Sequence, residues 1–144
     1  MSEYWQHQHT CLAKPRGFHL ITEEIEKTLQ AMPPFTIGLV HLFLLHTSAS
    51  ISISENACKD VRDDLENFFS TTIPDNANLY KHTIEGQDDM PAHIKNVLLG
   101  TQLTIPIKNG QMALGQWQGI YLCEHRNQPN PRRILITAHG TLKK

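Results

Sequence analysis

Hydrophobic and polar positions along the chain follow two periods, which predict strands and helices in mixed order. Apolar residues at every second position are typical of strands, and a spacing of three and four is typical of amphipathic helices. We predict strands at residues 4–12, 18–21, 36–45, 51–54, 103–107, 112–124 and 133–140. We predict helices at residues 22–32, 57–69 and 91–98. Strands that outnumber helices, with a largely antiparallel C-terminal half, indicate the α+β class.

Three of these segments carry more specific expectations. Residues 36–45 are apolar almost throughout, which predicts a strand buried on both faces. Thr22 is expected to cap the first helix. Asn109-Gly110 predicts a hairpin, whose return strand is expected to run over residues 112–124.

A polar segment at residues 75–89 has no clear period and predicts a long loop, a kind of segment that often carries function. The short helix that follows is expected to begin at Pro91, which suits a first helical position. Its inward face is expected to consist of Ile94, Val97 and Leu98.

Composition narrows the class of protein. A chain of 144 residues with 40% apolar and 19% charged residues fits one domain, residues 1–144. A net charge of −1 without a long basic run argues against nucleic acid as the main partner. No apolar run is long enough to cross a membrane, and the N-terminus has no secretory pattern. Three cysteines without CxxC spacing favour the cytoplasm over a disulfide framework.

Nine histidines are the compositional outlier, and His46 is the first candidate among them. It lies where an apolar strand gives way to small polar residues, a common place for a site. An equally weighted interpretation is that His46 only hydrogen-bonds to backbone at the strand end. A nucleophilic role for Ser48 or Ser50 is not excluded, but the sequence offers no partners that complete such a site. His41, inside the same strand, is interpreted as a core or interface residue.

The second candidate is the segment 82–93, which contains two histidines and three carboxylates. Imidazole and carboxylate are ligands that borderline divalent metals prefer. His93 in a first helical turn can face back toward His82. The alternative is an acidic loop that only caps the helix; we assign that role to Asp88 and Asp89, but it does not explain the histidines.

The third candidate is the strand end at Glu124-His125-Arg126. A carboxylate and a cation there could orient a ligand histidine or bind an anion. For His125 and Arg126, a surface ion pair is the favoured interpretation.

Long stretches of the chain resemble the YjbQ family, also described as secondary thiamine-phosphate synthases. The resemblance rests on HTSASISISENACKDVRDDLENF, EGQDDMPAHIKNVLLGTQLTIPI, NGQMALGQWQGIYLCEHR and RRILITAHG, and extends from about residue 4 to Gly140. The chain departs from the family at Gln116, where Thr is common, and in the variable loop at residues 127–132.

The resemblance implies a mixed sheet that closes toward a barrel or sandwich, with three helices packed on it, and assembly as a homotrimer. It implies a divalent metal, Zn or Mg/Mn, with His46, His82 and His93 as ligands. It also implies roles for further residues beside the metal: Glu85, Glu124 and Gln118 in catalysis, and Ser48, Asn56 and Arg126 in binding.

The implied reaction joins a pyrimidine diphosphate to a thiazole phosphate and releases pyrophosphate. Such chemistry needs charge stabilisation on the leaving phosphates, which a metal and an arginine can supply. Glu85 or Glu124 would orient a ligand or water, and Arg126 would contact a phosphate of a small phosphorylated metabolite. A non-catalytic trimeric module that binds a metal or anion is the alternative function, and a structural scaffold with interface histidines is a third.

Overall fold

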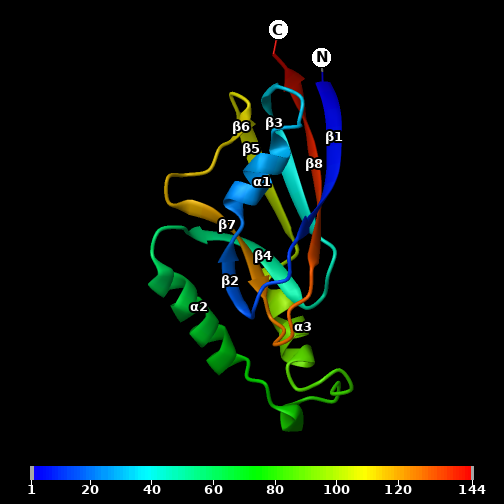
Figure 1. Ribbon diagram of the computed structural model, residues 1–144, viewed down its shortest axis with the longest axis vertical. Coiled ribbons are helices and arrows are strands. Elements are labelled where there is room, and N and C mark those ends of the chain that lie inside the picture. The colour runs from blue at the N-terminus through cyan, green and yellow to red at the C-terminus, as the bar shows by residue number, and fades with distance from the viewer. Residues whose placement is uncertain (1, 144) are drawn as a thin grey trace.

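The computed structural model describes residues 2–143 and contains two antiparallel sheets and three α-helices (Figure 1). The strands are β1 Ser2–Cys11, β2 Gly17–Leu20, β3 Phe35–Leu44, β4 Ala49–Glu55, β5 Gln102–Lys108, β6 Gln111–Met112, β7 Gln118–Glu124 and β8 Arg132–Leu142. The helices are α1 Thr22–Leu29, α2 Lys59–Thr72, the 3₁₀ turn η1 Ala77–Leu79 and α3 Asp89–Leu99. None of the helices described within residues 2–143 is long and apolar enough to cross a membrane.

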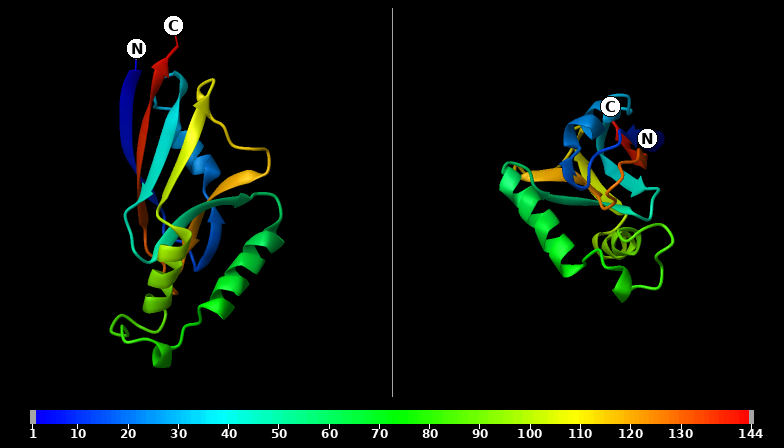
Figure 2. Two further views of the ribbon diagram at one scale, coloured as in Figure 1. Left: turned by 180° about the vertical axis from the view of Figure 1, so that it is seen from behind. Right: turned by 60° about the horizontal axis from the view of Figure 1, so that its bottom comes forward.

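The larger sheet has the strand order β1-β8-β3-β5-β6, and the smaller sheet has the order β2-β7-β4. Together they curl as a half-barrel around one core, and α1 contributes Ile25 and Leu29 to that core. Helices α2 and α3 lie below the barrel in Figure 1 and pack on the smaller sheet (Figure 2). The α+β class with three helices on a curled, antiparallel sheet is therefore confirmed.

Strand β7 connects the two layers because its alternate side chains enter different cores. Ile120 and Leu122 are buried in the core between the sheets. Tyr121 and Cys123 face a second core under the helices, together with Phe18. The alternation predicted for this strand is present, since successive side chains of a strand point to opposite faces.

The prediction that residues 36–45 are buried on both faces is wrong for the single chain. Val40 and Leu42 in β3 are fully buried, whereas Ile37 is 72% and Phe43 40% exposed. The outer face of the larger sheet carries no covering layer among the described residues, so its apolar side chains stay in solvent.

The predicted return strand at residues 112–124 is also wrong, because the segment divides between two sheets. β6 ends at Met112, and β7 pairs with β2 and β4 in the smaller sheet. A turn separates them: the Gln118 N–H donates to the Gly115 carbonyl, and the Gly115 N–H donates to Gln118 Oε1 at 2.7 Å. The side chain of Gln118 thus stabilises the crossing.

Helix α3 buries a different face from the one predicted. Val97 and Leu98 are 79% and 64% exposed, while Ala92 and Lys95 are buried. Ala92 is small and lets the helix approach β4 closely. Lys95 lies one turn further along the same helix face and is therefore buried as well. The predicted cap at Thr22 is wrong as well: this residue lies inside α1, and its hydroxyl accepts the Ile120 N–H at 2.9 Å.

Candidate functional site

The turn before α3 brings the loop of residues 82–88 back onto the first turn of the helix. Gly86 adopts a φ of 111°, a left-handed conformation that favours glycine. Its N–H donates to the Thr83 carbonyl, and its own carbonyl accepts the Asp89 N–H. This tight turn places His82 against the helix that carries Asp89 and His93.

Three side chains meet there and form the His82–Asp89–His93 cluster. His82 Nε2 lies 2.8 Å and His93 Nε2 3.1 Å from Asp89 Oδ2. The three candidate ligand atoms all lie within 4.8 Å of one another. Asp89 and His93 are four residues apart on α3, a spacing that puts both on one face of a helix.

Burial and hydrogen bonding orient these groups toward a common point. The Asp89 side chain is 4% exposed, whereas His82 is 45% and His93 29% exposed, so solvent reaches the cluster from one side. His93 Nδ1 donates to the Thr47 carbonyl at 2.7 Å, which directs Nε2 toward Asp89 Oδ2. Metal-binding histidines commonly use their second ring nitrogen in this way.

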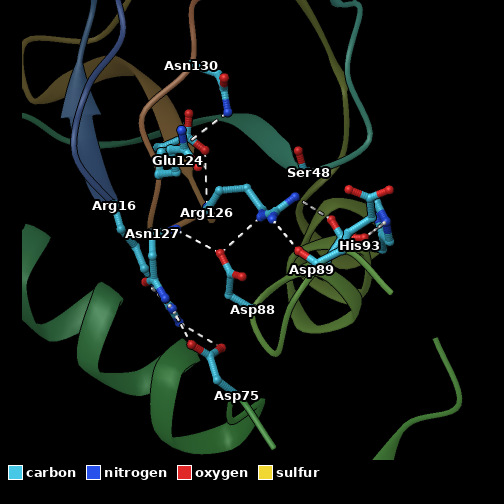
Figure 3. A network of polar contacts seen from close by, with 12 residues as sticks. Arg16, Ser48, Asp75, Asp88, Asp89, His93, Glu124, Arg126, Asn127 and Asn130 are labelled. Atoms are coloured by element: carbon cyan, nitrogen blue, oxygen red, sulfur yellow. Dashed lines mark hydrogen bonds and ion pairs between the residues drawn. The ribbon is translucent and has the colours of Figure 1, made fainter. Parts of the chain in front are cut away.

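Arg126 fixes the carboxylates behind the cluster (Figure 3). Its Nη1 donates to Asp89 Oδ1 at 2.6 Å, its Nε to Asp88 Oδ2 at 2.9 Å, and its Nη2 to the Glu85 carbonyl at 2.9 Å. Each guanidinium nitrogen therefore has an acceptor inside the protein. The predicted phosphate-binding residue lies beside the cluster but directs its donors at protein atoms.

Asp88 belongs to the same network, and its side chain accepts from Arg126 and Asn127 instead of from the helix. Its Oδ2 also accepts the Asn127 N–H at 2.8 Å. Burial raises the pKa of Asp88, but the hydrogen bond from Asn127 and the Arg126 guanidinium outweigh it and hold the pKa below its ordinary value. Asp88 occupies the N-cap position of α3 and Asp89 its first turn, as predicted, but the Asp88 side chain forms no cap hydrogen bond.

His46 lies outside the His82–Asp89–His93 cluster. The Arg133 N–H donates to its Nε2 at 2.8 Å, and Arg132 Nη1 lies 3.5 Å from its Nδ1. Burial, followed by the charges of Arg132 and Arg133, lowers the pKa of His46. This arrangement corresponds to the alternative interpretation, in which His46 hydrogen-bonds to backbone. The third ligand position of the cluster is occupied by Asp89 instead.

Glu124 and Ser48 both contact Arg132. Glu124 is fully buried, with Oε1 2.7 Å from Arg132 Nε and Oε2 2.5 Å from Arg132 Nη2. The Ser48 carbonyl accepts a longer bond from Arg132 Nη2 at 3.4 Å. Glu124 is thus charge-paired in the interior rather than open to a substrate.

The other predicted residues are not brought to the cluster. Gln118 lies at the opposite end of β7 from Glu124, roughly 20 Å along the strand. Asn56 Nδ2 donates to the carbonyls of Gln116 and Gln118 at 3.1 and 3.2 Å, so it stabilises the same turn. Glu85 is exposed, and the contact it makes with Arg126 uses its backbone carbonyl.

His125 does not form the predicted surface ion pair but lies buried beneath the smaller sheet. Its Nε2 is 2.9 Å from Ser50 Oγ, and its Nδ1 has no partner among the described residues. Burial, with the charge of Lys95 next in importance, lowers the pKa of His125 to about 3. Lys95 Nζ also lacks a partner within residues 2–143, and burial lowers the pKa of that ammonium. These residues form an interior polar group, and its Lys95 carries no signal in the sequence because the residue lies in an ordinary helical pattern.

Comparison with known proteins shows extended similarity in sequence. Residues 7–141 match the family described as UPF0047 protein YjbQ-like. The UPF0047 protein YjbQ of Salmonella typhimurium is 51% identical over 137 residues, which cover 95% of this chain and 99% of that protein. A UPF0047 protein of Synechocystis is 42% identical and covers 94% of this chain and 92% of its own length.

Solved structures show the same fold. A YjbQ/UPF0047 protein from Clostridium acetobutylicum, described as uncharacterized, aligns with a TM-score of 0.80 at 33% identity over 90% of this chain and 97% of that one. A YbjQ-like protein of unknown function from Sulfolobus solfataricus aligns with a TM-score of 0.86 over 98% of this chain and 100% of that one. At 19% identity, the second alignment informs on the fold alone.

Proposed function

This chain belongs to the UPF0047 YjbQ-like family, and we propose that it is a metal-assisted enzyme acting on small phosphorylated metabolites. The observation that carries the proposal is the His82–Asp89–His93 cluster, whose ligand atoms lie within 4.8 Å of one another. Two imidazoles and a carboxylate converge there at the first turn of α3, where solvent reaches the imidazoles, and Arg126 holds the buried carboxylate from behind.

The donor set fits a borderline divalent ion. Two imidazole nitrogens and one carboxylate oxygen suit Zn²⁺ or Mn²⁺ better than Mg²⁺, which prefers oxygen ligands and water. His82 and His93 would bind through Nε2, and Asp89 would bind through Oδ2. Arg126 would keep the Asp89 carboxylate oriented through its hydrogen bond to Oδ1. The ion itself would supply charge stabilisation to a leaving phosphate.

The specific reaction proposed is the synthesis of thiamine phosphate from a pyrimidine diphosphate and a thiazole phosphate, with release of pyrophosphate. This reaction is inferred from the family resemblance. It needs a cation near the departing pyrophosphate, and a metal bound by the cluster would supply it. Besides Arg126, the side chain of Arg133 offers a positive charge for a phosphate. Arg133 is exposed, and its backbone N–H donates to His46.

An assay of product formation tests this reaction. The full-length protein would be incubated with both substrates and Zn²⁺, Mn²⁺ or Mg²⁺, and thiamine phosphate would be quantified by chromatography. We expect turnover in the unmodified protein and in His7→Ala, whose ring is exposed on β1 and serves as a matched control. His82→Ala and Asp89→Asn should lose it. Equal product in all four proteins, or none in any, would remove the synthase proposal.

A second candidate function is a non-catalytic module that binds a metal or anion. Two observations favour it: each guanidinium nitrogen of Arg126 already has an acceptor in the protein, and Glu124 is buried against Arg132. Neither side chain is poised for acid or base catalysis. Calorimetry that detects Zn²⁺ or pyrophosphate binding without turnover would select this function, and turnover would reject it.

The proposal includes a cytoplasmic homotrimer. Tyr4, Ile37, Leu39 and Phe43 are 77%, 72%, 38% and 40% exposed on the outer face of the larger sheet. Tyr4 and Leu39 flank His139 in register across β8, so they share one face. A large apolar face of this kind marks a protein interface. The free thiols of Cys11, Cys58 and Cys123 fit a reducing compartment.

A further inference from the structure

A second group of potential metal ligands lies where strand β1 meets helix α1. It consists of His9, Cys11 and Glu24, whose candidate ligand atoms all lie within 4.8 Å of one another. We infer that His9, Cys11 and Glu24 form a second metal site, which binds a thiophilic divalent cation of the Zn²⁺ class and connects β1 to α1. This inference is independent of the proposed function, because the site shares no residue with the His82–Asp89–His93 cluster.

The fold fixes two of the three ligands on a rigid strand. β1 pairs with β8 over its full length, with His9 opposite Ile134 and Cys11 opposite Arg132. Residues two apart in a strand point to the same face, so the imidazole and the thiol face inward together. The third ligand, Glu24, lies in the first turn of α1.

One of the two ring contacts of His9 resembles that of a bound histidine ligand, and the other lies where a metal would enter. His9 Nε2 lies 2.5 Å from Glu24 Oε2, and His9 Nδ1 lies 3.4 Å from Thr28 Oγ1. The Thr28 hydroxyl donates to the Glu24 carbonyl at 2.9 Å, so its lone pair is available to a proton on Nδ1. The 2.5 Å contact requires a proton between Nε2 and Glu24 Oε2; a metal would replace this proton, while the Nδ1–H bond to Thr28 would hold the ring in place.

The dimensions suit a small tetrahedral ion. Bonds of about 2.0–2.1 Å to nitrogen and oxygen and 2.3 Å to sulfur place ligand atoms roughly 3.3–3.7 Å apart. The separation of 2.5 Å between His9 and Glu24 is shorter, so Glu24 must retreat by about 1 Å. Its side chain is 31% exposed and has room to do so. The other oxygen, Oε1, can keep its contact with Lys14 Nζ at 3.9 Å.

Cys11 supplies the selectivity of the site. Its side chain is fully buried, and burial, followed by the nearby Glu24 carboxylate, raises the pKa of the thiol to about 12. Without a metal the group therefore stays a neutral thiol in the core. Coordination replaces the S–H bond with a metal–sulfur bond, and the proton leaves to solvent along the partly exposed His9–Glu24 side. A thiolate favours Zn²⁺ or Co²⁺ over Mg²⁺.

Cobalt(II) spectroscopy distinguishes this site from the other cluster, because His82, Asp89 and His93 contain no sulfur. A thiolate bound to Co²⁺ gives a charge-transfer band in the near ultraviolet that imidazole and carboxylate ligands do not give. Titration of the reduced, full-length His82→Ala/His93→Ala variant with Co²⁺ should produce this band with a stoichiometry of about one ion per chain. Added Zn²⁺ should abolish it by displacement.

Substitutions assign the band to Cys11. Cys11→Ser should eliminate it, whereas Cys58→Ser should retain it, because Cys58 is exposed and outside the group. Glu24→Gln keeps the thiol and the core packing, and should weaken Co²⁺ binding at least tenfold. Circular dichroism confirms that each variant is folded; if Cys11→Ser does not fold, Glu24→Gln and His9→Gln carry the same test at partly exposed positions.

The inference would be overturned by the absence of the band in the starting protein. It would equally be overturned by a band that survives in Cys11→Ser but disappears in Cys58→Ser, or by Co²⁺ affinity that Glu24→Gln and His9→Gln leave unchanged. In each of these cases Cys11 is a core residue beside an ordinary His9–Glu24 ion pair.

Discussion

The buried pair between Arg132 and Glu124 should be one of the most sensitive points of the fold. Arg132 is 5% and Glu124 0% exposed at the side chain, and two short hydrogen bonds join them. Arg132→Met keeps most of the apolar volume but removes both donors. Among residues 2–143, the Glu124 carboxylate then retains only the Arg126 N–H at 3.2 Å. Removing one partner of such a pair typically costs about 3–5 kcal/mol, because the other charge stays buried without compensation.

Urea unfolding followed by circular dichroism measures this effect as a change in the free energy of unfolding. The matched control is Lys59→Met, which breaks the exposed pair with Asp63, whose side chains are 76% and 58% exposed. That change should stay within about 0.5 kcal/mol. The double variant Glu124→Leu/Arg132→Met should recover a large part of the loss, since neither charge of this pair remains buried. A loss below about 1 kcal/mol for Arg132→Met would refute the assignment of a desolvated ion pair.

Three further outcomes are expected. Lowering the pH from 6.5 to about 3 should decrease the free energy of unfolding. In this range the unfolded chain binds a proton at His125, whose ordinary pKa is 6.5, whereas the folded protein does not, because its His125 pKa is about 3. The decrease reaches at most about 4 kcal/mol, and thermal unfolding of a His125→Asn variant should lack this component. Lys95→Met should raise the free energy of unfolding by roughly 1–3 kcal/mol in urea titrations. The reason is that it replaces a buried ammonium that lacks a partner within the described chain. A loss of stability would show that Lys95 has a partner in the folded protein. Ile37→Lys should reduce the mass measured by light scattering from three chains to one, because it places a charge on the exposed apolar face; an unchanged mass would place the subunit interface elsewhere.

The order of the elements could be predicted from the sequence because it depends on local periods. The alternation in β5 and β7 and the turn at Asn109-Gly110 are properties of neighbouring residues, and the structure contains them. The outer face of β3 could not be predicted in the same way. An apolar strand face has the same composition whether a second layer of the same chain covers it or an assembly partner does. The crossing between β6 and β7 depends on the side chain of Gln118, which no periodicity reveals.

The candidate site was partly predictable for a related reason. His82 and His93 were found from the density of imidazoles and carboxylates in one short segment, and the structure brings them together. Asp89 was interpreted as a cap, although its spacing of four from His93 on a helix was visible in the sequence. His46 and Glu124 were expected nearby because the family resemblance implied it. Their partners, Arg132 and Arg133, come from the start of β8, a tertiary contact that spacing along the chain does not encode.

The position of a bound metal tests the central claim most directly. Anomalous diffraction from crystals of the full-length protein soaked in Mn²⁺, which avoids the thiol site, would locate the ion. We predict a peak about 2.0–2.3 Å from His82 Nε2, His93 Nε2 and Asp89 Oδ2, with none beside His46. A peak on His46, or none at the His82–Asp89–His93 cluster at saturating Mn²⁺, would contradict it.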